Sequence, residues 1–219
     1  MNLTLTYYLD VVSSWCHWAE PAWNELHRQF RDRVRFQWKI ALLDASGLPA
    51  SAAQEDWFYR RSGTINRASY KLNSGWFEAG WPEYLAPNAV AEAAKDFGVA
   101  DDRVRLAIAH AGLISGQRIG RWETAIQAAI EAVALDRTAL EGKARSPEIE
   151  ARVRASTAEF HAFQITQRPA FVLEDSIGDR AVFSGLVKAA PIAATLEAML
   201  DDVAAYASWA AHFGPPPAS

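Results

Sequence analysis

The order of secondary-structure signals over residues 3–43 restricts the fold more than any other feature of the sequence. Residues 3–9 are rich in β-branched and aromatic side chains, which is typical of a strand. Residues 14–33 then place apolar side chains at helical spacing, and residues 34–43 alternate before becoming continuously apolar, as in a strand covered on both faces. A strand, a helix and a strand in this order predict two parallel strands joined by a right-handed crossover.

The middle of the chain, residues 46–164, predicts helices and no strands. Its first part, up to residue 87, is irregular, is interrupted by glycine and proline, and contains many aromatic side chains. Apolar periodicity then predicts successive helices at 89–97, 101–114, 122–133, 137–143 and 147–163. We interpret the whole segment as a helical insertion.

Two short strands and a helix are predicted after the insertion. Apolar residues at 170–174 and 180–183 flank a turn-forming segment, and helical periodicity covers 190–209. This order predicts an α/β protein with a thioredoxin-like fold and a large all-helical insertion. Its predicted parts are a thioredoxin-like domain at 1–45 and 165–210, a helical insertion domain at 46–164, and a disordered tail at 211–219.

Composition and net charge indicate which kinds of molecule this protein can bind. The chain has 219 residues, of which 50% are hydrophobic and 22% charged, so a well-packed globular protein is expected. The net charge of -4, with basic and acidic residues interspersed, provides no positive field for a phosphate backbone. We therefore expect a small-molecule substrate and no nucleic acid partner.

Cysteine usage and hydropathy favour the cytoplasm. Cys16 is the single cysteine, so no disulfide can form within the chain, as is usual in a reducing compartment. The first nine residues contain no lysine or arginine, and we expect no secretory signal there. No apolar run approaches the roughly 18 residues that a membrane helix needs. We therefore expect a cytoplasmic protein without a membrane partner.

Two small polar residues stand where the first strand meets the first helix. Ser13 and Ser14 occupy this junction, and Cys16 follows about one turn into the helix. Backbone N–H groups and the positive end of the helix dipole point at this position and favour an anion such as a thiolate. Ser13 either caps the helix or takes part in chemistry, and Cys16 is either a small hydrophobic core residue or a redox group.

This junction resembles two related families. The stretch D-V-V-S-S-W-C at residues 10–16 is similar to the D-x-x-C-P-W-C segment of DsbA-like oxidoreductases, with Ser13 and Cys16 at the two cysteine positions. It is also similar to the D-x-x-S-P-Y-S segment of kappa-class glutathione transferases and 2-hydroxychromene-2-carboxylate isomerases. In that second group the serine hydrogen-bonds the sulfur of bound glutathione. The resemblance implies the same role for Ser13 and implies glutathione as the cofactor.

A second similar segment precedes the third strand. Residues 146–173 resemble the stretch of the same group that contains a cis-proline, and Pro169 falls on that proline. The resemblance implies that the backbone of Arg168 receives the extended cysteinyl part of glutathione or of a peptide. The kappa-class pattern has an acid after its last strand, whereas residues 183–186 contain none. The residues implied in cofactor binding are Ser13, Ser14, Trp15, Arg168, Pro169, Ser184 and Gly185.

Several further side chains have two interpretations each. The Arg168 guanidinium either pairs with a substrate carboxylate or is solvated. Trp57, Trp76 and Trp81 follow the second strand, where this fold places its cleft, and they either line a substrate pocket or belong to the core. His17 is interpreted as a structural or surface residue. The five histidines are scattered along the chain, so no metal site is predicted.

Three functions are consistent with these residues. The leading interpretation is an enzyme of the kappa-class transferase and chromene-carboxylate isomerase type, in which a glutathione thiolate reacts with a small aromatic or conjugated carbonyl substrate. Its catalytic candidates are Ser13 and Cys16. The first alternative is a DsbA-like thiol–disulfide oxidoreductase that uses Cys16 alone, and the second is a non-catalytic ligand-binding relative. Relatives of both enzyme types are often dimers, so a homodimer is compatible with the sequence.

Overall fold

A four-stranded mixed sheet forms the centre of the molecule. The structure, a computed structural model, describes residues 2–185 and 187–214. The strands are β1 (Leu3–Leu9), β2 (Arg35–Ile40), β3 (Ala170–Asp175) and β4 (Arg180–Ser184), in the spatial order β2-β1-β3-β4. β1 and β2 are parallel, and the other two neighbouring pairs are antiparallel. The α/β architecture predicted from the sequence is therefore confirmed.

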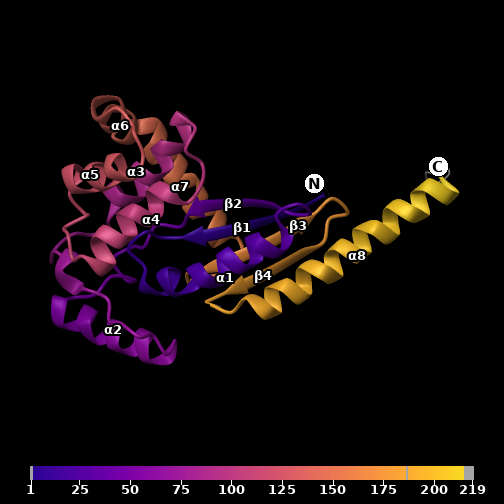
Figure 1. The fold of residues 1–219 in the computed structure, drawn as a ribbon, viewed down its shortest axis with the longest axis horizontal. Coiled ribbons are helices and arrows are strands. Elements are labelled where there is room, and N and C mark those ends of the chain that lie inside the picture. The colour runs from indigo at the N-terminus through magenta and orange to yellow at the C-terminus, as the bar shows by residue number, and fades with distance from the viewer. Residues whose placement is uncertain (1, 186, 215–219) are drawn as a thin grey trace.

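Within the described residues, eight α-helices accompany the sheet. They are α1 (Ser14–Phe30), α2 (Ala52–Ile65), α3 (Leu85–Ala94), α4 (Arg103–Ala109), α5 (Trp122–Ala132), α6 (Arg137–Ala144), α7 (Pro147–Ala162) and α8 (Ala189–Phe213). Helices α3 to α7 gather at one end of the sheet, whereas α8 runs along the sheet and extends past its other end (Figure 1). None of these helices is long and apolar enough to cross a membrane.

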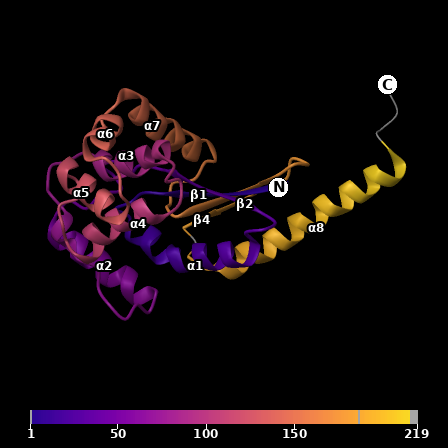
Figure 2. The same cartoon turned by 45° about the horizontal axis from the view of Figure 1, so that its top comes forward.

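Alternating side chains of β1 pack against different layers on the two faces of the sheet. Leu3, Leu5 and Tyr7 belong to the main core, which includes the buried faces of α1 and α8. Tyr8 points to the opposite face, where it packs with Phe160 of α7. Figure 2 shows α1 and α8 on one side of the sheet and α7 on the other. Each fully buried side chain of this kind stabilises the fold by about 1.5–3 kcal/mol relative to exposure.

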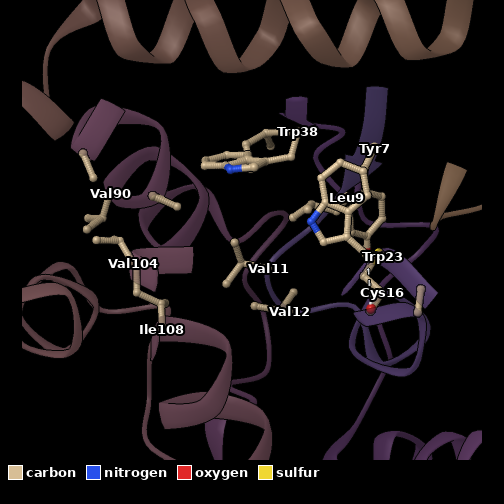
Figure 3. Packing of buried hydrophobic residues seen from close by; sticks show 14 of the residues in the cluster. Tyr7, Leu9, Val11, Val12, Cys16, Trp23, Trp38, Val90, Val104 and Ile108 are labelled. Atoms are coloured by element: carbon tan, nitrogen blue, oxygen red, sulfur yellow. Dashed lines mark hydrogen bonds between the residues drawn. The ribbon is translucent and has the colours of Figure 1, made fainter. Parts of the chain in front are cut away.

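The main core continues from the sheet into the helical insertion. Figure 3 shows Tyr7 and Trp23 at one side of a buried cluster and Val104 and Ile108 of α4 at the other, with Val11 between them. The same picture shows the hydrogen bond from the Tyr7 hydroxyl to the Cys16 carbonyl, which measures 3.0 Å. The strand–helix junction is therefore surrounded by side chains from both parts of the molecule.

One helix lies where the sequence analysis predicts an irregular segment. α2 occupies Ala52–Ile65, so the prediction for residues 46–87 is wrong at this point. The cause is that the buried residues of α2 include Glu55 and Ser62, so its apolar side chains do not form a continuous stripe. A local signal was present, because the Ser51 hydroxyl accepts a hydrogen bond from the Gln54 amide at 3.2 Å, as in a capping box.

The last helix is longer than the sequence predicts. α8 continues past residue 209 to Phe213, so the first residues of the predicted disordered tail are helical. The rings of Trp209 and Phe213 lie 4.0 Å apart on successive turns, and the helix ends at Gly214, whose φ is 76°. The rest of the predicted tail, residues 215–219, lies outside the described residues.

A buried ionic network joins α1 to α4. The Arg105 side chain is 3% exposed and donates to the Glu20 carboxylate at 2.6 and 3.0 Å and to Asp102 at 2.8 Å. Asp102 also accepts a hydrogen bond from the indole of Trp23 at 2.9 Å. Removing one member would leave an uncompensated charge inside the protein.

We predict that Arg105→Ala lowers the free energy of unfolding by about 3–5 kcal/mol, because Glu20 and Asp102 would lose their buried partner. Urea denaturation followed by circular dichroism measures this change. The matched control is Arg103→Ala, whose side chain pairs with Asp101 at the surface and should cost less than about 1 kcal/mol. Equal losses for the two variants would contradict the prediction.

Candidate functional site

Ser13 caps helix α1 at the end of β1. Its side-chain oxygen accepts a hydrogen bond from the Cys16 amide at 3.3 Å, and its own amide donates to the Asp10 carbonyl at 3.1 Å. The residue is 8% exposed and extended in its backbone, as expected of an N-cap. Capping uses one lone pair of the hydroxyl, which can still donate its proton to a sulfur anion. The Ser13 side chain accordingly acts to lower the pKa of the Cys16 thiol, although burial has the larger, opposite effect.

The Asp10 carboxylate binds the two backbone segments on either side of Ser13. It accepts hydrogen bonds from the amide of Val12 at 2.9 Å and from the amide of Leu43, beyond β2, at 2.7 Å. Asp10 is fully buried, and this burial raises the pKa of its carboxyl group, although the two amides act in the opposite direction. The same carboxylate therefore holds the start of α1 next to the segment that follows β2.

A cavity of about 470 Å³ opens beside Ser13. Its walls come from the start of α1, the segment after β2, helix α2, and the loop before β3. Among the lining residues are Ser13, Ser14, Trp15, Glu55, Trp76 and Arg168. An adjoining cavity of about 420 Å³ shares Trp15, Arg61, Gln167 and Arg168 with the first and reaches Gly185. The two cavities thus lie on either side of the same four side chains, one reaching Trp76 and the other reaching Gly185.

The loop before β3 forms one side of this space. The Arg168–Pro169 peptide bond is cis. The Pro169 carbonyl accepts a hydrogen bond from the Gly185 amide at 2.8 Å, and the Gln167 carbonyl accepts one from the Ser184 hydroxyl at 3.2 Å. These bonds connect the loop to the end of β4 and so bring the predicted cofactor-binding residues from both segments together.

The Arg168 guanidinium is engaged with the protein backbone. It donates to the carbonyls of Ala41, Leu42 and Thr166, with the Leu42 bond at 2.7 Å. It also lies over the Phe160 ring, 4.5 Å from the centroid. Desolvation lowers the pKa of this guanidinium. The side chain thus connects the loop before β3 to the segment after β2, and its pairing with a substrate carboxylate stays a prediction.

Cys16 faces a different space from Ser13. Its side chain is 3% exposed and lines a separate cavity of about 200 Å³ that also includes Glu20 and Arg105. Desolvation by burial raises the pKa of the thiol to about 11, so it is protonated at neutral pH. The neighbouring His17 lies near the surface, with its imidazole 2.7 Å from the Tyr70 hydroxyl.

Of the three tryptophans predicted as pocket residues, Trp76 alone lines the cavity beside Ser13 in the part of the chain that the structure describes. It is buried, and its indole donates to the Tyr59 hydroxyl at 2.6 Å. Trp57 is 56% exposed and lies under the Arg61 guanidinium. Trp81 stacks on the Tyr84 ring, 5.5 Å between centroids.

The sequence analysis missed the contribution of α2 to the site. Glu55, Phe58 and Arg61 line the cavity at intervals of three residues, which places them on successive turns of one helix face. The capping box at Ser51 was the signal that could have predicted this helix. In the described ranges, no group of three or more histidine, cysteine or acidic side chains could hold a metal ion.

The sheet, the insertion between β2 and β3, and the cavity at the start of α1 define a thioredoxin-like protein with a ligand site at its first helix. Residues 4–197 match the family model of the DSBA-like thioredoxin domain. The chain therefore belongs to this family, and the predicted thioredoxin-like fold with a helical insertion is confirmed.

Solved structures of other proteins share this fold. The cytosolic disulfide reductase DsbM from Pseudomonas aeruginosa has a TM-score of 0.70 and 18% identity, over 90% of this chain and 98% of its own. The structure of DsbM with GSH has a TM-score of 0.68 and 18% identity, and the match covers 90% of this chain and 99% of the DsbM chain. The oxidoreductase NmDsbA1 from N. meningitidis has a TM-score of 0.57 and 16% identity, over 94% and 86%. No curated protein matches the chain.

We predict that Cys16 of the folded protein reacts slowly with iodoacetamide at neutral pH. The reason is that the thiol is buried and its pKa is raised to about 11, so little of the reactive thiolate is present. Mass spectrometry after timed exposure measures the extent of alkylation. The same protein in concentrated urea is the control and should be modified rapidly, whereas rapid modification of the native protein would contradict the prediction.

Proposed function

We propose that this protein is a glutathione-dependent isomerase or transferase of kappa-class type, which acts on a small aromatic or conjugated carbonyl substrate. The observation that carries the proposal is a serine, Ser13, at the helix N-terminus beside the large cavity. A hydroxyl at this place has too high a pKa to act as an alkoxide, but it can donate a hydrogen bond to a ligand sulfur anion. The nucleophile would then belong to the ligand.

Several features of the site support glutathione as the ligand. The cavity beside Ser13, of about 470 Å³, has room for a small ligand next to the start of α1, and the adjoining cavity shares its Trp15 and Arg168 walls. Ser13 and the start of α1 supply a hydroxyl and a positive dipole end for a thiolate. The edge of the Pro169 loop supplies backbone groups for a peptide-like chain. Bound glutathione would supply the thiolate, and Ser13 would hold it.

The structure of DsbM with GSH supports the proposal to a limited degree. It concerns a protein of the same fold, and at 18% identity the likeness extends to the fold alone. We also propose that this chain acts in the cytoplasm. Thiols stay reduced in that compartment, so glutathione would be present there in its thiol form.

The environment of Cys16 counts against dithiol or monothiol exchange as the main activity. Attack on a disulfide requires a thiolate that the partner can reach. Cys16 is buried, protonated at neutral pH and separated from the cavity that Ser13 lines. Retention of the cavity without catalysis is the remaining alternative, and an activity assay distinguishes it from the proposal.

We predict that glutathione binds the wild-type protein and that Ser13→Ala weakens this binding by about tenfold or more. A hydrogen bond to a charged group contributes about 1.5–3 kcal/mol, and the variant removes it. Isothermal titration calorimetry with reduced glutathione measures the two dissociation constants.

The control for the loss of a helix cap is Ser146→Ala. Ser146 caps α7 and accepts a hydrogen bond from the Ile149 amide at 3.3 Å, the same length as the cap bond of Ser13. This variant should lose similar stability and keep its glutathione affinity. Absence of binding to the wild-type protein at millimolar glutathione would overturn the cofactor assignment, and equal affinities for wild type and Ser13→Ala would overturn the role of Ser13.

A further inference from the structure

Glu55 is a buried carboxyl group in the wall of the Ser13 cavity. It projects from the first turn of α2 and is 6% exposed. The nearby Tyr59 side chain lowers the pKa of this carboxyl group, and the Tyr59 hydroxyl accepts a hydrogen bond from the Trp76 indole at 2.6 Å. Among the residues that the structure describes, none forms an ion pair with Glu55. The carboxyl group thus lies beside an uncharged Trp76–Tyr59 pair, which does not neutralise it.

The other deeply buried acids of this protein have strong partners. Glu92 pairs with Lys95 at 2.7 Å, Glu20 pairs with Arg105 at 2.6 Å, and Asp10 accepts hydrogen bonds from two backbone amides. A buried carboxylate without such compensation costs free energy. An apolar residue at position 55 would stabilise the fold more than this carboxyl group does. We therefore expect that the carboxyl group has a functional role in the cavity that it lines.

Burial gives this group a titration range close to neutral pH. Desolvation raises the pKa of Glu55 to about 7, and the hydrogen bond from Tyr59 limits the increase. Both the acid and the carboxylate are therefore present at neutral pH, which is the condition for efficient proton transfer in both directions.

We propose that Glu55 is the general acid–base residue of this cavity, which exchanges a proton with a conjugated carbonyl substrate bound between Ser13 and the aromatic wall at Trp76. The inference rests on the proposed function, because it assumes a sulfur nucleophile held at Ser13. It adds the identity of the proton donor, which is supplied by a helix that the sequence analysis did not predict.

The step balances without an added oxidant or reductant. As a carbon–sulfur bond forms at the β-carbon of an α,β-unsaturated carbonyl compound, the π electron pair of the C=C bond moves toward the α-carbon. Glu55 gives its proton to that carbon and becomes a carboxylate. When the adduct leaves, water returns a proton to Glu55, which balances the proton that the glutathione thiol lost to water on forming the thiolate. In the reverse direction the Glu55 carboxylate removes the α-proton, the C=C bond forms again, and the thiolate leaves with the electron pair of the carbon–sulfur bond.

Other charged groups also face this cavity. Asp44 and Arg168 line it from the segment after β2 and from the loop before β3, Arg61 lines it from α2, and His161 lines it from the end of α7. Hydrogen bonds from Ser46 lower the pKa of Asp44, so its carboxylate stays ionised near neutral pH. His161 is another ionisable side chain of this wall, so His161→Asn is the matched control for any pH dependence assigned to Glu55.

The test uses the intact protein with reduced glutathione and benzylideneacetone as the conjugated probe, and it follows the loss of enone absorbance. We expect the wild-type rate to fall above pH about 7, where Glu55 loses its proton. Glu55→Gln keeps the side-chain size and an acceptor for Tyr59, and should lower kcat by at least about a hundredfold while abolishing that fall. Glu55→Asp, which keeps the carboxyl group, should restore part of the rate.

A second variant and a second readout separate proton transfer from structure. Tyr59→Phe removes the hydrogen bond that lowers the pKa of Glu55, so the fall in rate should move to higher pH. Infrared difference spectra should show a carboxylic acid band that titrates near pH 7 in the wild type, moves with Tyr59→Phe and disappears in Glu55→Gln. Glutathione affinity, measured by calorimetry, should be the same in Glu55→Gln and wild type.

Each remaining outcome overturns one specific claim. If wild type binds glutathione but does not consume the enone, or if Glu55→Gln keeps the rate and its pH dependence, the inference about Glu55 is wrong and the proposed cofactor stands. If His161→Asn abolishes the fall in rate, or if Glu55→Gln weakens glutathione binding, Glu55 is not the proton donor. If wild type does not bind glutathione, the proposed function itself is wrong.

Discussion

A single buried carboxylate, that of Asp10, holds together the segments from which the candidate site is built. It accepts hydrogen bonds from the amides of Val12 and Leu43, while the Asp10 carbonyl accepts one from the amide of Ser13. Without the carboxylate, two backbone donors would be buried without partners, at a cost of about 1–3 kcal/mol each. Because these bonds fix the start of α1 against the segment after β2, they also determine where the cavity opens.

The chemistry available at this site follows from which group stands at the helix N-terminus. Ser13 occupies that position and lines the cavity of about 470 Å³, whereas Cys16, three residues further along, lines one of about 200 Å³. Cys16 also lies in the first turn of α1, but burial outweighs the helix end there and keeps its thiol protonated. This arrangement underlies the proposal that Ser13 holds the sulfur anion of a ligand and that Glu55, in the wall of the same cavity, exchanges the accompanying proton.

Predictions that rest on local patterns agree with the structure. The strands and most of the helices have a regular apolar period, and this period depends only on which face each element buries. α2 lacks such a period, because Glu55, Tyr59 and Ser62 are its buried residues. A glutamate in a polar segment is normally exposed, so the sequence contained no signal that Glu55 faces a cavity. The exposure of Trp57 and the burial of Trp76 were equally beyond a local pattern, since both residue types occur in cores and at surfaces.

By itself, the sequence determined the order of strands and helices and the residues at the start of α1. These depend on neighbours within a few positions, through periodicity, capping and the family-like motif around Ser13. The tertiary structure alone decided that Ser13 and Cys16 line separate cavities and that carbonyls of a distant segment bind the Arg168 guanidinium. It also decided that Glu55 has no ion-pair partner among residues 2–185 and 187–214. The physical reason is that burial and hydrogen-bond or ionic partners set the protonation state and reactivity of a group. The residues that bury a group and pair with it come from segments far apart in the chain.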